Sequence, residues 1–192
     1  MNYLAHLYFA DKTAESLIGN LLGDFVKGNV AKAQYNLVIQ SGIEMHRKID
    51  AYTDAHEIVR NAKRIISPVR RRFAGILVDL FFDHFLARRW NEFHTMRLEE
   101  FTQWAYQVLQ QTNISLPDRL QYVLPFMIKE DWLTSYREID SVGQAINGIS
   151  RRLRRENTLA GGIEELIANY DEFEAVFQSF FPELIEFVKT QK

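Results

Sequence analysis

Apolar residues recur along most of this chain at spacings of three and four, the period of an α-helix with one buried face. On this pattern we expect helices over 13–27, 36–52, 55–66, 68–90, 98–111, 118–132, 141–155, 163–169 and 171–189. No stretch alternates convincingly between apolar and polar residues as a half-buried strand does. The sequence therefore predicts an all-α fold, with residues 1–192 forming a single-domain helical bundle.

Cap and breaker residues set the expected ends of these helices. Ser67 followed by Pro68 is typical of an N-cap and a first helical position, so a long helix is expected to begin at Pro68. Proline inside a helix removes a backbone donor, so a bend or break is expected near Pro125 and an interruption near Pro182.

Two short segments near the start carry ionisable groups on otherwise apolar faces. His6 is surrounded in sequence by leucine and phenylalanine, and Asp24 lies inside the apolar arc of the helix predicted over 13–27. Burying an unpaired carboxylate is costly, so Asp24 needs a partner. The alternatives are a packed core histidine at position 6 and an ion pair with an arginine for Asp24.

The stretch 42–56, GIEMHRKIDAYTDAH, has a polar edge beside its apolar stripe. His46 and Asp50 stack one helical turn apart. A second stretch, DLFFDHFLARRW over 79–90, places Asp83 and His84 in a helix that is apolar nearly all round. Such groups can also be satisfied by ordinary hydrogen bonds or ion pairs.

A shared divalent cation would satisfy all of these groups together, because it removes the cost of burying carboxylates and neutral imidazoles. The candidate ligands are His6, Asp24, His46, Asp50, Asp83 and His84. The chain has no cysteine, so a thiolate site is excluded. A site of histidine and aspartate suits Mn²⁺, which we expect here, or Mg²⁺, Fe²⁺ or catalytic Zn²⁺.

The chemistry that fits such a centre is phosphoester hydrolysis by water. The sequence shows no nucleophilic serine elbow, no P-loop and no glycine-rich dinucleotide fingerprint. Basic runs accompany the candidate ligands, at 47–48, 60–72, 88–89 and 151–155, although the net charge is only −2. These runs fit a phosphate-bearing substrate on an acidic carrier, or nucleic acid, unless they are simply solvated faces.

Four ordered blocks of the chain carry a family resemblance. They are MNYLAHLYFA, SLIGNLLGDFVKG, GIEMHRKIDAYTDAH and RRFAGILVDLFFDHFLARRW. Together they resemble the acyl carrier protein phosphodiesterase family, closely over 1–92 and collinearly to the C-terminus. The resemblance implies an all-helical fold related to the HD-domain metal phosphohydrolases, with the ligand-bearing segments in altered order.

The activity implied by the resemblance is hydrolysis of the phosphodiester that joins 4′-phosphopantetheine to a serine of holo-acyl carrier protein. The products would be apo-acyl carrier protein and free 4′-phosphopantetheine, a step of fatty-acid and lipid metabolism. The partner would be an acidic helical protein. On this hypothesis Asp54 or His56 transfers a proton, while Arg47, Arg71 and Arg72 contact phosphate or carrier.

Two other functions remain open from the residues themselves. One is an HD-like phosphohydrolase acting on a nucleotide or another small phosphodiester. The other is a non-catalytic helical module that binds an acidic protein through its arginines.

The location of the protein is predicted from three features of the sequence. The N-terminal residues lack the pattern of a signal peptide, and no stretch reaches the 18 or so apolar residues of a membrane span. The absence of cysteine is compatible with a reducing compartment. We therefore expect a cytoplasmic protein with no membrane segment and no nucleic-acid partner; the sequence predicts no oligomeric state.

Overall fold

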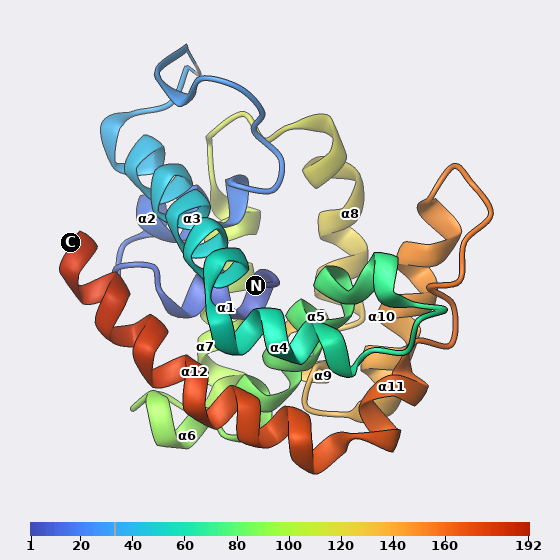
Figure 1. The fold of residues 1–192 in the computed structure, drawn as a ribbon. Helices are drawn as coiled ribbons and strands as arrows, with labels where there is room; N and C mark the ends of the chain where they lie inside the picture. The colour runs from blue at the N-terminus through green and yellow to red at the C-terminus, as the bar shows by residue number, and fades with distance from the viewer. Residues whose placement is uncertain (33) are drawn as a thin grey trace.

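The computed structural model describes residues 1–32 and 34–192 (Figure 1). Within them the chain forms twelve α-helices, two short 3-10 helices and no strand. The first seven α-helices are α1 (Tyr3–Tyr8), α2 (Ala14–Leu22), α3 (Leu37–Ala55), α4 (Glu57–Ile65), α5 (Ala74–Arg88), α6 (Trp90–Phe93) and α7 (Leu98–Gln111). The rest are α8 (Asp118–Lys129), α9 (Trp132–Ser135), α10 (Ile139–Arg152), α11 (Ile163–Ala168) and α12 (Tyr170–Gln191). The 3-10 helices are η1 (Val30–Lys32) and η2 (Arg71–Phe73). The predicted all-α fold is confirmed.

Helix α5 is the centre of a single hydrophobic core. It contacts α1, α4, α10 and α12, and its aromatic residues Phe81, Phe82 and Phe85 are fully buried. Helix α12 runs along the outside of the bundle and packs against α3, α4 and α5 (Figure 1). This arrangement agrees with the prediction that α5 is apolar nearly all round. In the described residues no helix combines the length and the apolar character needed to cross a bilayer.

Helices α2 and α3 pack with their backbones in direct contact. A Cβ added to Gly19 would lie 2.5 Å from the Ile39 carbonyl oxygen, and one added to Gly42 would lie 2.8 Å from the Gly19 Cα. Only glycine at both positions permits this approach. The contact fixes the register of α3 against α2, one helical turn before His46.

Most of the predicted helices are present, with shifted ends. The helix predicted over 98–111 is found with both ends as expected. Helix α2 ends at Leu22, earlier than predicted, so Asp24 lies in the turn that follows it. Helix α3 extends to Ala55, three residues beyond the predicted end, and therefore carries Asp54 as well.

The predicted helix start at Pro68 and the predicted breaks at Pro125 and Pro182 are wrong. Helices α8 and α12 continue through Pro125 and Pro182, and both prolines face the exposed side of their helix. On that side the carbonyl freed by the missing N–H can reach water, so the cost of the proline is reduced. No helix begins at Pro68, because the chain turns there and α5 starts at Ala74.

The turn after α4 is tied instead to α11 by a buried carboxylate. Glu165 accepts hydrogen bonds from the backbone N–H of Ser67 at 3.0 Å and from the Ser67 hydroxyl, and Arg70 Nη1 donates to it at 3.3 Å. Burial opposes ionisation of Glu165, but these hydrogen bonds outweigh it and lower the pKa of the carboxyl below its ordinary 4.5.

We predict that Glu165→Gln lowers the free energy of unfolding by about 1–3 kcal/mol at pH 7, since a charge-assisted network loses its charge. A carboxyl with a lowered folded-state pKa stabilises the protein above its unfolded pKa. That contribution disappears as pH falls through the folded pKa, so the difference from wild type should shrink below pH 4.5.

Denaturant unfolding at several pH values measures this difference. The matched control is Glu164→Gln, which removes an exposed partner of the same arginine and should cost less than about 1 kcal/mol. Equal losses for the two variants would contradict the prediction.

Candidate metal centre

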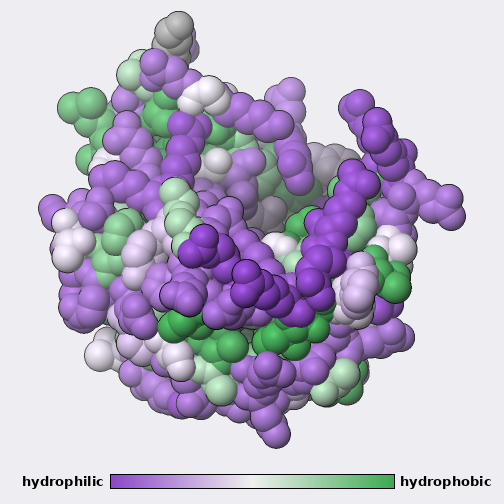
Figure 2. Space-filling model, in the orientation of Figure 1, coloured by the Kyte–Doolittle hydropathy of each residue, from purple (hydrophilic) through white to green (hydrophobic). Residues whose placement is uncertain are grey.

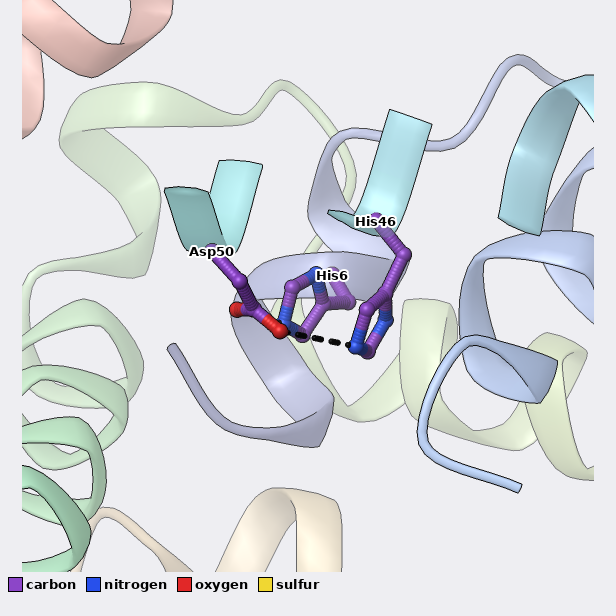
Figure 3. Close-up of side chains that lie close together, drawn as sticks. All are labelled: His6, His46 and Asp50. Carbon is purple, nitrogen blue, oxygen red and sulfur yellow. Dashed lines mark ion pairs between the residues drawn. The ribbon is translucent and has the colours of Figure 1, made fainter. Parts of the chain in front are cut away.

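Two histidines and one aspartate from separate parts of the chain meet at one point (Figure 3). His6 comes from α1, and His46 and Asp50 come from adjacent turns of α3. His6 Nε2 lies 3.1 Å from Asp50 Oδ1, and His46 Nε2 lies 3.2 Å from Asp50 Oδ2. One ligand atom from each of the three lies within 4.8 Å of the other two. The two imidazole rings are stacked, with centroids 3.5 Å apart.

Asp24 adjoins this group from the turn after α2. Its Oδ1 lies 3.6 Å from His46 Nε2, and its side chain is 42% exposed. Asp24 is thus on the solvent side of the cluster, whereas both histidines are buried. The structure brings together four of the six predicted ligands, and we call His6, Asp24, His46 and Asp50 the His/Asp cluster.

The orientation of His46 is set by its backbone surroundings. Its Nδ1 lies 2.7 Å from the Asn20 carbonyl oxygen, which can only accept, so Nδ1 carries a proton. Nε2 is thereby directed at Asp24 and Asp50. The ring also occupies the space beside Gly23, where an added Cβ would lie 2.1 Å from the His46 Cγ. Gly23 therefore makes room for the imidazole.

The pKa values of the two histidines are shifted in opposite directions. Burial alone would lower the pKa of His46, but the neighbouring carboxylates of Asp24 and Asp50 outweigh burial and raise it to about 9. Burial, together with the neighbouring charge of His46, lowers the pKa of His6 to about 4. Burial would raise the pKa of Asp50, but hydrogen bonds from both histidines hold that pKa well below its usual range. The stacked pair therefore carries one positive charge at neutral pH, and that charge is on His46.

This donor set fits a divalent cation. It offers two imidazole nitrogens and two carboxylates, the ligands that Mn²⁺, Fe²⁺ and catalytic Zn²⁺ share, and it contains no sulfur. The hydrogen bond from Nδ1 of His46 to a carbonyl is the usual support for a metal-binding histidine. A cation would replace the proton between the rings and the carboxylates, since ligating histidines are neutral.

An amino group and another carboxylate border the cluster. The Met1 amine donates to Asp50 Oδ1 at 3.3 Å and to Asp79 Oδ1 at 3.1 Å. Asp79, on α5, is thus linked to Asp50 through one cation, although the sequence did not single it out as a site residue. Its position one helical turn before Asp83 was the available signal.

Asp83 and His84 lie outside the His/Asp cluster. Asp83 Oδ2 accepts from the Leu4 N–H at 2.8 Å and Oδ1 accepts from the Ala5 N–H at 3.2 Å, which caps the first turn of α1. Nδ1 of His84 lies 2.8 Å from the Tyr136 carbonyl, and Nε2 lies 3.0 Å from the Tyr170 hydroxyl. These contacts account for both buried groups without a metal.

The two residues expected to transfer protons lie at the end of α3, beyond the cluster. Asp54 is exposed and accepts from Lys63 Nζ at 2.6 Å. Nε2 of His56 lies 3.2 Å from Glu183 Oε2 on α12. Neither contacts a cluster residue in the hydrogen bonds and ion pairs of the described chain.

Two of the three arginines expected to contact substrate are engaged with the backbone. Arg47 donates to the Val26 and Gly28 carbonyls, both at 2.8 Å, and so holds the loop that follows Asp24. Arg71 donates to the Ile66 and Arg64 carbonyls at 2.8 and 3.0 Å. Arg72 is exposed, and no hydrogen bond or ion pair of the described residues involves it.

A cavity of about 510 Å³ lies away from this cluster. Aromatic side chains line much of it, among them Phe9, Phe93 and Trp104, and lysines at 12, 189 and 192 lie at its edge. None of the four cluster residues lines it. The His/Asp cluster and this cavity are therefore two separate sites on the molecule.

Comparison with known proteins gives one consistent result. A family model described as "Acyl carrier protein phosphodiesterase" matches residues 1–184. A protein of that name from Serratia proteamaculans is 38% identical over 194 residues, which covers all of both chains. Another from Enterobacter sp. is 37% identical over 193 residues, also all of both chains. A third from Photorhabdus laumondii is 34% identical over 187 residues, 97% of this chain and 94% of the relative.

The fold and the cluster define an all-helical protein with a His/Asp site suited to a divalent cation. The chain belongs to the acyl carrier protein phosphodiesterase family, a family of phosphoric diester hydrolases. The resemblance of its four sequence blocks to this family is thereby confirmed. No solved structure matches the chain.

We predict that Gly23→Ala weakens Mn²⁺ binding by about 10- to 100-fold, the range expected when the support of a ligand is disturbed. The new methyl group must displace the His46 ring. Gly75→Ala is the matched control, because an added Cβ there meets nothing within 4 Å. Isothermal titration calorimetry measures both affinities, and equal affinities for the two variants would contradict this role of Gly23.

We further predict that His6→Ala, His46→Ala and Asp50→Asn each weaken Mn²⁺ binding by at least about 100-fold, because each removes a donor atom. His84→Gln should bind Mn²⁺ as wild type does, since its partners are Tyr136 and Tyr170. Calorimetry with thermal unfolding of each variant separates lost binding from lost folding. A folded His84→Gln protein with a similar loss of affinity would return His84 to the ligand set.

Proposed function

We propose that this protein hydrolyses the phosphodiester between 4′-phosphopantetheine and a serine of holo-acyl carrier protein. The observation that carries the proposal is the convergence of His6, His46 and Asp50 in a chain whose full-length relatives are named acyl carrier protein phosphodiesterases. The products are apo-acyl carrier protein and 4′-phosphopantetheine. This reaction belongs to lipid metabolism in the cytoplasm, where we expect the protein to act.

The proposed cofactor is a divalent metal, with Mn²⁺ as the first candidate. His6, His46, Asp50 and Asp24 would hold it, and Asp83 and His84 are not part of this proposed ligand set. When bound, such a cation polarises a phosphoryl oxygen and lowers the pKa of bound water. The exposure of Asp24 leaves the cluster open on its solvent side, where a large substrate can reach it.

The reaction balances with water as the only co-reactant. A bond forms between the water oxygen and phosphorus, and the bond between phosphorus and the serine oxygen breaks. The serine oxygen gains a proton, and the phosphate leaves with the pantetheine. The chain must therefore accept one proton from water and deliver one to serine.

Asp54 and His56 remain our candidates for this proton transfer. Asp54 follows Asp50 by one turn of α3 and is exposed to solvent, so a substrate over the cluster passes near it. His56 pairs with Glu183, which orients its ring. Which of them carries the proton depends on the position of the serine oxygen.

The carrier itself is the proposed partner. Hydrophilic side chains surround the hollowed face of the molecule in Figure 2, and the exposed Arg72 is among the residues proposed to meet an acidic protein. Opposite charges across such a contact speed association and fix orientation. Arg47 and Arg71 would act indirectly, by holding the loops to which they donate.

The direct test is incubation of the protein with holo-acyl carrier protein and Mn²⁺, followed by mass spectrometry of the carrier. We expect the carrier to lose the mass of 4′-phosphopantetheine, and we expect no loss with His46→Ala or after removal of metal by a chelator. A carrier that stays intact with Mn²⁺, Mg²⁺, Fe²⁺ and Zn²⁺ would refute the proposed function.

A further inference from the structure

A line of aromatic contacts leads from the His/Asp cluster to the C-terminal half of the chain. Tyr3 lies one turn before His6 on α1, and its ring stacks on Phe25 with centroids 6.2 Å apart. The guanidinium of Arg119, on α8, lies 5.8 Å from the centre of the Phe25 ring. Phe25 directly follows Asp24 in the chain, so the contacts of Arg119 lead back to the turn that carries Asp24.

A second arginine, Arg152, also influences the Tyr3 hydroxyl. Burial and the charge of Asp24 raise the pKa of Tyr3, the charges of Arg119 and Arg152 lower it, and together they bring it to about 12. Arg152 is the last residue of α10. Helix α10 lies on the same side of the molecule as α8, which carries Arg119 (Figure 1). The Tyr3 hydroxyl keeps its proton at neutral pH.

Neither arginine has another evident task. Both are exposed, and no hydrogen bond or ion pair among residues 1–32 and 34–192 uses either side chain. Arg70, in contrast, pairs with Glu164 and Glu165, and Arg47 donates to backbone carbonyls. Among the described residues Arg119 and Arg152 are therefore cations with no carboxylate in an ion pair.

The helices that carry them stand across from the cluster. In Figure 1 the α2–α3 pair lies on one side and α8 with α10 on the other, with the N-terminus between them. Figure 2 shows that the surface is hollowed between these two sides. A group placed over the cluster would therefore have the arginines on its opposite flank.

We propose that Tyr3, Arg119 and Arg152 form an anion-binding half-site that takes the non-bridging oxygens of a phosphate ester while the His/Asp cluster takes its metal-facing side. Guanidinium groups suit phosphate because their N–H groups match its oxygens in pairs. The Tyr3 hydroxyl adds a neutral donor. The identity of the ester rests on the proposed function, but the half-site itself is defined by phosphate alone.

The test is the binding of inorganic phosphate to the Mn²⁺-supplied protein by isothermal titration calorimetry. We expect Arg119→Ala and Arg152→Ala each to weaken phosphate binding about tenfold or more, as for the loss of a charge-assisted hydrogen bond, and Tyr3→Phe by about two- to tenfold. Mn²⁺ affinity, measured separately, should change less than about twofold. Arg119→Gln serves as a second variant, because it keeps part of the side chain over Phe25.

The matched control is Arg97→Ala, which removes one exposed arginine before α7. It should bind phosphate as wild type does. The half-site is refuted if wild type binds no phosphate, if Arg119→Ala and Arg152→Ala bind phosphate normally, or if Arg97→Ala loses as much affinity.

The two proposals fail in different ways. If phosphate binding depends on Arg119 and Arg152 but wild type leaves holo-carrier intact, the half-site stands and the proposed substrate is wrong. If wild type releases phosphopantetheine and both arginine variants release it equally fast with unchanged phosphate affinity, the substrate stands and the half-site is wrong.

Discussion

The backbone contact between α2 and α3 is the constraint on which the His/Asp cluster depends. Because Gly19 and Gly42 let the two helices touch, the Asn20 carbonyl comes within 2.7 Å of His46 Nδ1. That hydrogen bond turns the other ring nitrogen toward Asp24 and Asp50. A larger residue at either glycine would separate the helices and leave the buried His46 ring without the Asn20 carbonyl. The geometry of the site therefore requires the close packing of these two helices.

Opposite charges lie close together in the cluster. The charged His46 ring is stacked on the neutral His6 ring beside Asp24 and Asp50, and the Met1 amine supplies another positive charge at Asp50. Such an arrangement is costly unless opposite charges are close together. A divalent cation held by these four side chains would replace the proton on His46 and would add positive charge beside the carboxylates. The same physical reasoning identified the cluster from the sequence.

Sequence reasoning predicts which residues lie close together when one helix fixes their spacing. It does not predict the partners that come from other parts of the fold. His46 and Asp50 are four residues apart on one helix, so their proximity could be predicted from helical spacing. Asp83 and His84 are as buried as expected, yet the Leu4 and Ala5 amides and Tyr136 satisfy them. A buried polar residue shows that a partner exists, but spacing along one helix does not say which partner.

The same limit applies to the fold and to the arginines. The periodicity of apolar residues predicted the helices. The breaks predicted at Pro125 and Pro182 are absent because both prolines face solvent, and the packing of the helix decides which side faces solvent. Arg119 and Arg152 lie far from the cluster in sequence and have no motif around them. Their position follows from how α8 and α10 pack, which periodicity does not specify.

Helix α1 has only six residues, fewer than an isolated helix needs to be stable in water, yet it delivers His6. It exists because Asp83 caps it and the core receives Leu4 and Leu7. A segment held in this way can open locally while the rest of the bundle stays folded. The lifetime of a cation in this centre would then be set by the fraying of one short helix, so metal exchange and global unfolding would proceed at independent rates.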